Sequence, residues 1–323
     1  MTAELGLGLA ALGRPAYITL GHGETFAGAT DPDAVERRCH DVLDAARAGG
    51  VRYLDAARSY GRAEVFLGRW LRQRAVEPGE LQVASKWGYR YVGGWAVDAE
   101  VHEEKEHSLQ RLEQQWQKTR EHLWEYLDVY QIHSATLETG VLEDAGVRAA
   151  LGRLRDERGL AIGLSVTGPR QGEVVDRALA IEVEGRPLFT VVQATLNLLE
   201  RSVEPALARA SAAGRRVVIK EALANGRLAG AATGEARPGI GLADRLDEAA
   251  RAAGLGLDAV ALAAVRQRPF VDVVLSGASS VEQLRANLRA TAVDSDLARA
   301  LWDDTAPETA AAYWAYRASL PWT

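Results

Sequence analysis

Short apolar runs recur along the chain, and longer stretches of mixed polarity separate them. Eight runs stand out as candidate strands: LGLGLA (5–10), GVRYLD (50–55), ELQVASK (80–86), YLDVYQIH (126–133), LAIGLSV (160–166), LFTVVQAT (188–195), RRVVIKE (215–221) and FVDVVLSG (270–277). Their nearly continuous apolar character is typical of strands that are buried on both faces. The chain is therefore expected to contain a large, mostly parallel sheet.

The stretches between the runs have the spacing of amphipathic helices. Residues 33–50 (DAVERRCHDVLDAARAGG) follow Asp31 and Pro32, which is a helix start signal, and end in two glycines, which is a stop signal. Val35 and Val42 belong to an apolar stripe along this segment. Strand–helix alternation repeated eight times predicts a parallel sheet that closes into a TIM-type (β/α)8 barrel.

The length of the chain and the lack of a Pro/Ser-rich linker in the sequence favour one barrel domain, residues 1–323, since such a barrel commonly reaches ~250 residues or more. We expect a long loop after the third strand and, over residues 293–323, a helix followed by an aromatic tail that can close over one face. The segment GAATGEARPGIG (230–241) predicts a lid or insertion between the seventh strand and its helix. GHGE, around His22, is interpreted as a substrate-side loop.

Charge and composition narrow the possible partners and the compartment. The net charge is −6 and the pI about 5.7, which argues against nucleic acid as a partner because phosphate binding needs a basic footprint. Cys39 is the single cysteine, so no disulfide within the chain can form, and a cytoplasmic location is expected. The first residues lack a basic signal-peptide region, and no run of ~18 apolar residues predicts a membrane span.

Polar residues stand at the ends of three consecutive apolar runs. Asp55 ends the second run, Lys86 the third and His133 the fourth, and Tyr60 lies in the loop after the second. Alone, each has an ordinary explanation, such as a helix cap, a surface lysine or a packed ring. In a barrel, however, these strand ends meet at the face where active sites form. The four residues together predict an acid–base cluster.

The chemistry of this cluster suits hydride transfer to a carbonyl, with the tyrosine supplying the proton. A neighbouring ammonium is expected to lower the pKa of Tyr60 from its ordinary value of about 10. A carboxylate next to Lys86 would keep that lysine charged and in place. An imidazole can hydrogen-bond the substrate carbonyl and hold it for attack.

Seven motifs occur in an order that resembles the aldo-keto reductase family. They are YLDAARSYG (53–61), ASKWG (84–88), LDVYQIH (127–133), GLSV (163–166), VVQATLN (191–197), LANGRLAG (223–230) and SGASSVEQLRANL (276–288). The resemblance extends from Leu5 to Leu288. It implies a TIM-type barrel, a nicotinamide cofactor bound without a Rossmann domain, and a catalytic tetrad with Tyr60 as general acid/base; the tetrad is Asp55, Tyr60, Lys86 and His133.

The resemblance also implies cofactor-binding positions. Ser165 and Gln193 match residues that usually hold the carboxamide, although Val166 stands where the family usually has Asn. The loop that grips the pyrophosphate is matched by Leu223, Gly226 and Leu228, and the adenosine-phosphate end by Gly277, Ser279, Gln283 and Asn287.

Lys220 stands where the family often has a ring stacked on the nicotinamide. Three roles remain open for it: it can pair with Glu221, contact an anionic substrate, or lie against the cofactor by its alkyl stem. The resemblance implies NADP(H) as the expected cofactor. Many relatives have a basic residue in place of Ser279 and a glutamate in place of Ala286, and because this chain departs from them at both positions, NAD(H) also stays possible.

Aromatic residues follow Lys86 in the long loop, and rings in such loops usually line a substrate pocket. Trp87 is the first candidate for substrate contact, ahead of Tyr91 and Trp95. No metal is expected, because the histidines of HEEKEH (102–107) are five positions apart, roughly 140° around a helix. That segment is interpreted as a solvated helix start.

The expected function is NAD(P)H-dependent interconversion of an aldehyde or ketone and its alcohol, with a small-molecule carbonyl compound as the partner. Two alternatives stay open: an NAD-dependent sugar (aldose) dehydrogenase, and a cofactor-binding regulatory or accessory subunit with little turnover. The substrate, the direction of reaction and the oligomeric state are not predicted.

Overall fold

Eight parallel strands close into a barrel in the computed structural model, which describes residues 2–20, 22, 30–230 and 240–323. Neighbours around the barrel run β1, β12, β11, β10, β7, β6, β3, β2 and back to β1. The eight expected strands are confirmed, with these bounds: β1 Glu4–Gly8, β2 Tyr53–Asp55, β3 Gln82–Trp87, β6 Leu127–Ala135, β7 Ala161–Val166, β10 Val191–Thr195, β11 Arg216–Lys220 and β12 Val273–Ser276.

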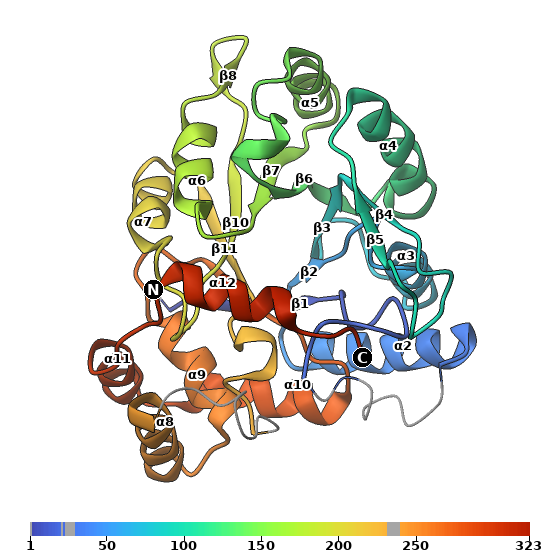
Figure 1. Ribbon diagram of the computed structural model, residues 1–323. Helices are drawn as coiled ribbons and strands as arrows, with labels where there is room; N and C mark the ends of the chain where they lie inside the picture. The colour runs from blue at the N-terminus through green and yellow to red at the C-terminus, as the bar shows by residue number, and fades with distance from the viewer. Residues whose placement is uncertain (1, 21, 23–29, 231–239) are drawn as a thin grey trace.

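Helices surround the barrel, as Figure 1 shows. Over the described residues they are α2 Pro32–Ala48, α3 Ala63–Gln73, α4 Leu109–Leu123, α5 Ala145–Arg158, α6 Gln171–Leu179, α7 Glu204–Ala212, α8 Ile240–Ala253, α9 Leu257–Arg266, α10 Val281–Leu288, α11 Ser295–Asp303 and α12 Ala310–Ser319. Short 3₁₀ turns are η1 Leu137–Thr139, η2 Ala224–Gly226 and η4 Arg289–Ala292.

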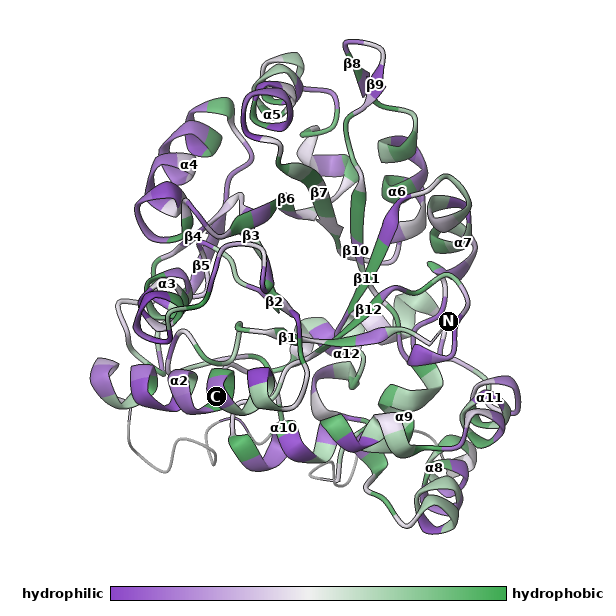
Figure 2. Cartoon of the chain, turned by 180° about the vertical axis from the view of Figure 1, so that it is seen from behind, coloured by the Kyte–Doolittle hydropathy of each residue, from purple (hydrophilic) through white to green (hydrophobic). Residues whose placement is uncertain are grey.

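Helix α2 shows how the sequence signals operate. The carboxylate of Asp31 accepts a hydrogen bond from the backbone N–H of Ala34 at 2.9 Å, which satisfies one of the free donors of the first turn. Val35 and Val42 are buried against the barrel. Figure 2 shows the same division across the molecule, with apolar strands inside and hydrophilic helix surfaces outside.

Alternation along the strands places the reactive groups inside the barrel. An apolar cluster fills the lower interior, where Leu275 packs above a layer that consists of Tyr53, Ala84, Val129, Val191, Val218 and Val273. Side chains two residues further along a strand point to the same face. Asp55, Lys86, Gln131, Gln193 and Lys220 therefore lie one layer above, at the C-terminal mouth.

The long loop after β3 carries an antiparallel hairpin of β4 (Tyr89–Tyr91) and β5 (Glu103–Lys105). The expectation of a helix start at 102–107 is thus wrong: Glu103–Lys105 pair as a strand, and α4 begins only at Leu109, where Ser108 caps it. A second small hairpin, β8 (Glu182–Val183) with β9 (Arg186–Pro187), joins α6 to β10 and lies at the upper edge of Figure 1.

The C-terminal tail crosses the mouth of the barrel, where Figure 1 shows α12 lying in front of the strands. The backbones of Tyr17 and Thr323 exchange two hydrogen bonds, of 3.0 and 3.2 Å. This confirms the expected closure over one face. Of the two expected loops, residues 231–239 of the lid, and 21, 23 and 24 of the GHGE loop, lie outside the described residues.

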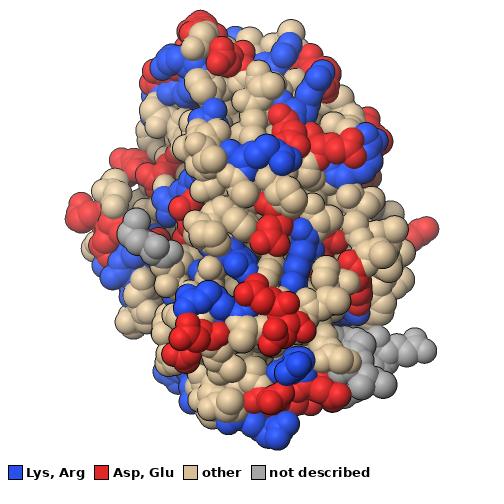
Figure 3. Space-filling view, turned by 90° about the vertical axis from the view of Figure 1, so that its left-hand side faces the viewer, with Lys and Arg blue, Asp and Glu red and all other residues tan. Residues whose placement is uncertain are grey.

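Two surface properties bear on partners. Figure 3 shows acidic and basic side chains interspersed over the face in view, without one large patch of a single sign. Within the described ranges, no helix is long and apolar enough to cross a membrane.

Candidate active site

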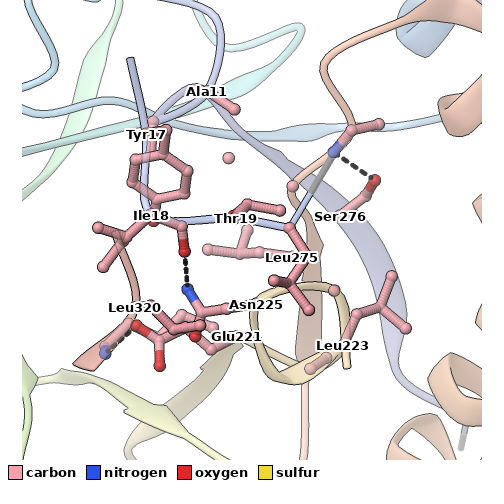
Figure 4. Close-up of a pocket in the computed structure, with 18 of the residues that line it drawn as sticks. Ala11, Tyr17, Ile18, Thr19, Glu221, Leu223, Asn225, Leu275, Ser276 and Leu320 are labelled. Carbon is pink, nitrogen blue, oxygen red and sulfur yellow. Dashed lines mark hydrogen bonds and ion pairs between the residues drawn. The ribbon is translucent and has the colours of Figure 1, made fainter. Parts of the chain in front are cut away.

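A cavity of about 700 Å³ opens at the C-terminal mouth of the barrel. Tyr60 and His133 lie at one end of it, and Gly277, Gln283 and Asn287 line the other. Figure 4 shows the middle of the cavity, where the amide of Asn225 donates to the carbonyl of Ile18 at 2.9 Å. An elongated ligand can therefore extend from the end that holds Tyr60 and His133, the candidate catalytic end, to the start of α10.

The four residues predicted to form the tetrad meet at the catalytic end. The ammonium of Lys86 contacts a carboxylate oxygen of Asp55 and donates to the carbonyl of Ala56 at 3.0 Å. It lies 3.4 Å from the phenol oxygen of Tyr60, which in turn lies 3.5 Å from Nε2 of His133. The phenol thus stands between an ammonium and an imidazole.

The hydroxyl of Ser59 fixes the orientation of the imidazole. Its oxygen lies 3.3 Å from Nδ1 of His133. When Ser59 donates this hydrogen bond, Nδ1 is the acceptor and the ring proton resides on Nε2. His133 can then donate a hydrogen bond toward the position beside Tyr60 where a carbonyl oxygen would bind.

Burial dominates the protonation of the cluster. Burial, and after it the charge of Asp55, raises the pKa of Tyr60 well above its usual value, so the phenol is protonated. The expectation that Lys86 lowers this pKa is therefore wrong as a net effect. Burial also lowers the pKa of Lys86, which Asp55 opposes. Burial and the charges of Lys86 and Lys220 lower the pKa of His133 well below its usual value, so the imidazole is neutral.

Two side-chain amides hold the second oxygen of Asp55. The Nε2 groups of Gln131 and Gln193 donate to Oδ1 at 3.3 and 3.1 Å. Because a carboxylate only accepts, this contact turns the Oε1 atom of Gln193 away from Asp55. That oxygen is buried and has no hydrogen-bond partner among the described residues. Gln193 therefore presents an unsatisfied acceptor at the cavity wall.

The predicted cofactor-binding residues divide into two groups. The cavity is lined by Gln193, Lys220, Leu223, Gly226, Gly277, Gln283 and Asn287. Ser165, Leu228 and Ser279 are buried and are not among the lining residues. Ser165 accepts a hydrogen bond from the backbone N–H of Ser134 at 2.8 Å, and Ser279 donates to Gln283, so these two act on neighbouring residues.

Trp87 does not line the cavity, contrary to the expectation of substrate contact. Lys86 points into the barrel, so the next residue on the strand points outward. The Trp87 ring has no exposed surface and packs edge-on against His107, with ring centroids 5.7 Å apart. Tyr89 lines the cavity instead, with its ring centroid 4.9 Å from that of His133.

A close backbone contact holds the loop that carries Tyr60. The backbone N–H of Arg62 donates to the carbonyl of Gly13 at 2.7 Å. A Cβ atom at Gly13 would lie 2.1 Å from the carbonyl oxygen of Tyr60, and Gly61 has a positive φ of 58°. Glycine is required at both positions, because a side chain would separate the two loops.

Lys220 belongs to a network that ties the tail to the barrel. Its ammonium donates to Oγ1 of Thr195 at 2.8 Å and lies 3.6 Å from Glu221. Arg317, on α12, binds both carboxylate oxygens of Glu221 at 2.6–3.0 Å. Burial would raise the pKa of Glu221, but Arg317 and Lys220 outweigh it and hold the value at about 2.

Further residues of the catalytic end were not predicted from the sequence. Arg14 is buried, donates to Glu103 at 2.7 Å, and lies 4.6 Å from the ring centroid of Trp322. Trp322 stacks on His102 with ring centroids 4.2 Å apart. These residues come from a loop, a hairpin and the tail, which are far apart in sequence, so no local motif indicates that they meet.

The far end of the cavity carries two acidic side chains, Asp258 at the start of α9 and Glu282 in the first turn of α10. Among the described residues, no lysine or arginine lines this end. Arg285 is exposed, lies outside the cavity lining, and its charge acts on Glu282. No group of histidine, cysteine or acidic side chains suited to a metal occurs within the described ranges.

Comparison with known proteins gives one family. The model of the Aldo/keto reductase family matches residues 4–299. A search of the curated proteins found no match.

Solved structures of the same architecture agree with this assignment. Aldo-keto reductase AKR11C1 from Bacillus halodurans, in its holo form, superimposes with a TM-score of 0.66 at 22% identity, covering 99% of this chain and 92% of that one. Two structures of Pseudomonas aeruginosa proteins described as aldo-keto reductases give TM-scores of 0.61 and 0.60. They are 22% and 23% identical, and cover 91% of this chain and 92% and 91% of their own.

Proposed function

This chain belongs to the aldo/keto reductase family and is an oxidoreductase acting on carbonyl compounds, and on that premise we propose that Tyr60 is its general acid/base and that a nicotinamide cofactor supplies its hydride. The observation that carries the proposal is the position of the Tyr60 phenol, 3.4 Å from the Lys86 ammonium and 3.5 Å from the His133 imidazole, at one end of the cavity.

The residues of the cavity fit such a cofactor. The carboxamide of nicotinamide carries an N–H₂ donor, and the buried Oε1 of Gln193, which has no hydrogen-bond partner within the described ranges, is a matching acceptor. The cavity continues past Leu223 and Gly226 to Asn287, so one elongated ligand can occupy it from the tetrad to α10. When bound, the reduced nicotinamide supplies a hydride to the substrate carbon.

His133 and Tyr60 then orient the substrate carbonyl and supply the proton to its oxygen. Neutral His133 donates from Nε2 to the carbonyl oxygen and places it beside the phenol of Tyr60. As negative charge develops on that oxygen, the protonated phenol donates its proton to it. The ammonium of Lys86 stabilises the tyrosinate that forms. Asp55 contributes by holding Lys86 in place.

The test is a pair of variants measured with NADH or NADPH and a panel of aldehydes, following the loss of nicotinamide absorbance. Tyr60→Phe should lower kcat by about 10²–10⁴-fold, the usual contribution of a positioned general acid. It should still bind cofactor, measured by quenching of tryptophan fluorescence. Tyr126→Phe makes the same change outside the cavity lining and should behave as wild type. Full activity of Tyr60→Phe would exclude the proposed role.

The acidic far end of the cavity favours NAD(H), whereas the motif resemblance in the sequence led us to expect NADP(H), with NAD(H) possible. Asp258 and Glu282 can accept hydrogen bonds from ribose hydroxyls, and both would repel a 2′-phosphate. We expect NADH to bind more tightly than NADPH in fluorescence titrations. Asp258→Asn should narrow the difference; tighter binding of NADPH by the wild type would contradict this part of the proposal.

A further inference from the structure

Charged side chains at the catalytic end of the cavity pair with one another, and one cation is left over. The carboxylates of Asp55, Glu103 and Glu221 each bind one cation closely, namely Lys86, Arg14 and Arg317. Lys220 is the fourth cation, and it shares Glu221 with Arg317 at 3.6 Å. Lys86 lies behind the cavity lining, and no fourth carboxylate lines this end among the described residues. The described part of this end thus carries an excess of one positive charge.

Glu221 compensates the charge of Lys220 only in part, because Arg317 takes its direct hydrogen bonds. Its two oxygens accept three contacts from Arg317 at 2.6–3.0 Å, whereas the Lys220 ammonium lies 3.6 Å away, beyond hydrogen-bond distance. The ammonium donates to the neutral hydroxyl of Thr195 at 2.8 Å. An ammonium has three N–H groups, so donor capacity remains for a ligand.

The unfavourable burial of the Lys220 ammonium is reflected in its lowered pKa. Burial lowers the pKa of Lys220 to about 8; Glu221 opposes the shift, and Arg317 and Lys86 add to it. An isolated buried ammonium is unfavourable unless an anion accompanies it. An anionic ligand group beside Lys220 would therefore remove an unfavourable electrostatic interaction and also gain a charge-assisted hydrogen bond.

Lys220 is also within reach of a substrate held by the tetrad. It lines the same cavity as Tyr60 and His133, and its charge is one of those that lower the pKa of His133. The Lys220 side chain is 15% exposed. A small molecule with its carbonyl oxygen beside Tyr60 can thus extend a second group toward the Lys220 ammonium.

We propose that Lys220 recognises an anionic oxygen group carried by the substrate, so that the substrate class is a small aldehyde or ketone bearing a carboxylate or a phosphate. This rests on the proposed function, because it assumes that the carbonyl binds at Tyr60. The proposal selects one of the three roles that the sequence left open for Lys220, and it gives the fourth cation of this end a counter-ion.

The first experiment compares rigid, matched substrates. The 2-, 3- and 4-carboxybenzaldehydes are measured against their methyl esters, and glyceraldehyde 3-phosphate against glyceraldehyde, which separates the carboxylate and phosphate cases. The readout is the ratio of kcat/KM for the anionic member to that for its neutral partner. Lys220→Met should lower this ratio by about 10- to 100-fold, the loss of a hydrogen bond to a charged group. Lys220→Arg should retain most of it.

Lys118→Met is the matched control, because it removes the same charge from an exposed position on α4. Its ratio should equal that of the wild type. A wild-type ratio near one for every pair, or an unchanged ratio in Lys220→Met, overturns the anion role and leaves the proposed function standing. Absence of turnover with every aldehyde would instead count against the proposed function.

A binding measurement tests Lys220 independently of turnover. Benzoate should quench tryptophan fluorescence with a Kd that weakens as the pH rises through about 8, whereas the Kd of benzamide should not change. Among the groups near Lys220, Glu221 is ionised and His133 is neutral over pH 7–9.5, Glu221 raises the pKa of Arg317 against the effect of burial, and burial raises the pKa values of Tyr17 and Tyr89 to about 12. Burial lowers the pKa of Lys86, so Lys220→Met is titrated over the same pH range to separate the effect of Lys86 from that of Lys220. A pH-independent benzoate Kd, equal in Lys220→Met, would refute the assignment.

Discussion

In the Glu221–Arg317 pair, we expect replacement of Glu221 to destabilise the protein more than replacement of Arg317. Glu221→Gln removes the carboxylate that serves both Arg317 and Lys220, so two cations remain together at a site where the Glu221 side chain is only 8% exposed. Breaking a buried pair in this way costs about 3–5 kcal/mol of unfolding free energy. Arg317→Met is milder, because Lys220 stands 3.6 Å from Glu221 and can move to take over its charge. We expect Arg317→Met to lower the free energy of unfolding by about 1.5–3 kcal/mol, which is the usual contribution of a hydrogen bond to a charged group.

These energies translate into modest shifts in thermal stability. With an unfolding entropy of about 2.1 cal/mol/K per residue, a chain of 323 residues loses roughly 1.5 °C of Tm per kcal/mol. Glu221→Gln should therefore melt about 4–7 °C below the wild type, and Arg317→Met about 2–4 °C below. The double variant should be more stable than Glu221→Gln alone, since it removes one charge of each sign.

Calorimetry and urea denaturation of the wild type, both single variants and the double variant provide the measurement. A larger loss in Arg317→Met than in Glu221→Gln would refute the idea that Lys220 can accept Glu221. Strict additivity in the double variant would refute the coupling itself.

The same pair predicts a pH dependence of stability. The pKa of Glu221 is about 2 in the folded protein, where burial raises it and Arg317 and Lys220 more than offset burial, and about 4.3 when unfolded. A lowered carboxyl pKa contributes stability above the unfolded value, and that contribution is lost as the pH falls toward the folded value. The urea midpoint of the wild type should exceed that of Glu221→Gln by a constant margin at pH 5–7.5, and the margin should shrink from pH 4.5 toward 2.

Two further predictions concern the walls of the site. Gly13→Ala forces a Cβ to within 2.1 Å of the carbonyl oxygen of Tyr60, so we expect the free energy of unfolding in urea to fall by about 1–3 kcal/mol. We also expect kcat to fall by a larger factor than KM changes. An unchanged kcat would show that this contact does not position Tyr60. Trp87→Phe should lower Tm but leave KM for an aldehyde unchanged, because Trp87 is buried outside the cavity lining. Tyr89→Ala should raise KM, because Tyr89 lines the cavity. The reverse pattern in steady-state kinetics would restore Trp87 as a substrate contact.

Residue pattern was enough to predict the barrel, because each of its eight strands is an apolar run of its own and most end in a polar residue or a glycine. The tetrad was predictable for the same reason: Asp55, Lys86 and His133 lie at strand ends, and parallel strands in a barrel bring their ends together. The error over Trp87 was avoidable in principle. Period-two alternation from Lys86 already turns the following side chain out of the barrel.

Other features depend on contacts that no local pattern encodes. The contacts of Arg14 with Glu103 and with Trp322 join a loop, a hairpin and the tail across 89 residues or more. Whether Lys86 or burial dominates the pKa of Tyr60 is likewise a property of the whole environment, because desolvation sums over every atom packed around the phenol. Sequence identifies which groups can react, and packing decides their protonation.

The tail also sets the order in which a working site can arise during synthesis. The barrel strands end at Ser276, whereas Arg317 and Trp322, which line the cavity, lie after the last strand and leave the ribosome later than all eight strands. A nascent chain can close its sheet while the mouth is still uncovered and Glu221 still lacks its guanidinium partner. Competence for catalysis therefore waits for the synthesis of α12 and Trp322, and a product that stops before α12 would keep the tetrad but lack this wall of the cavity.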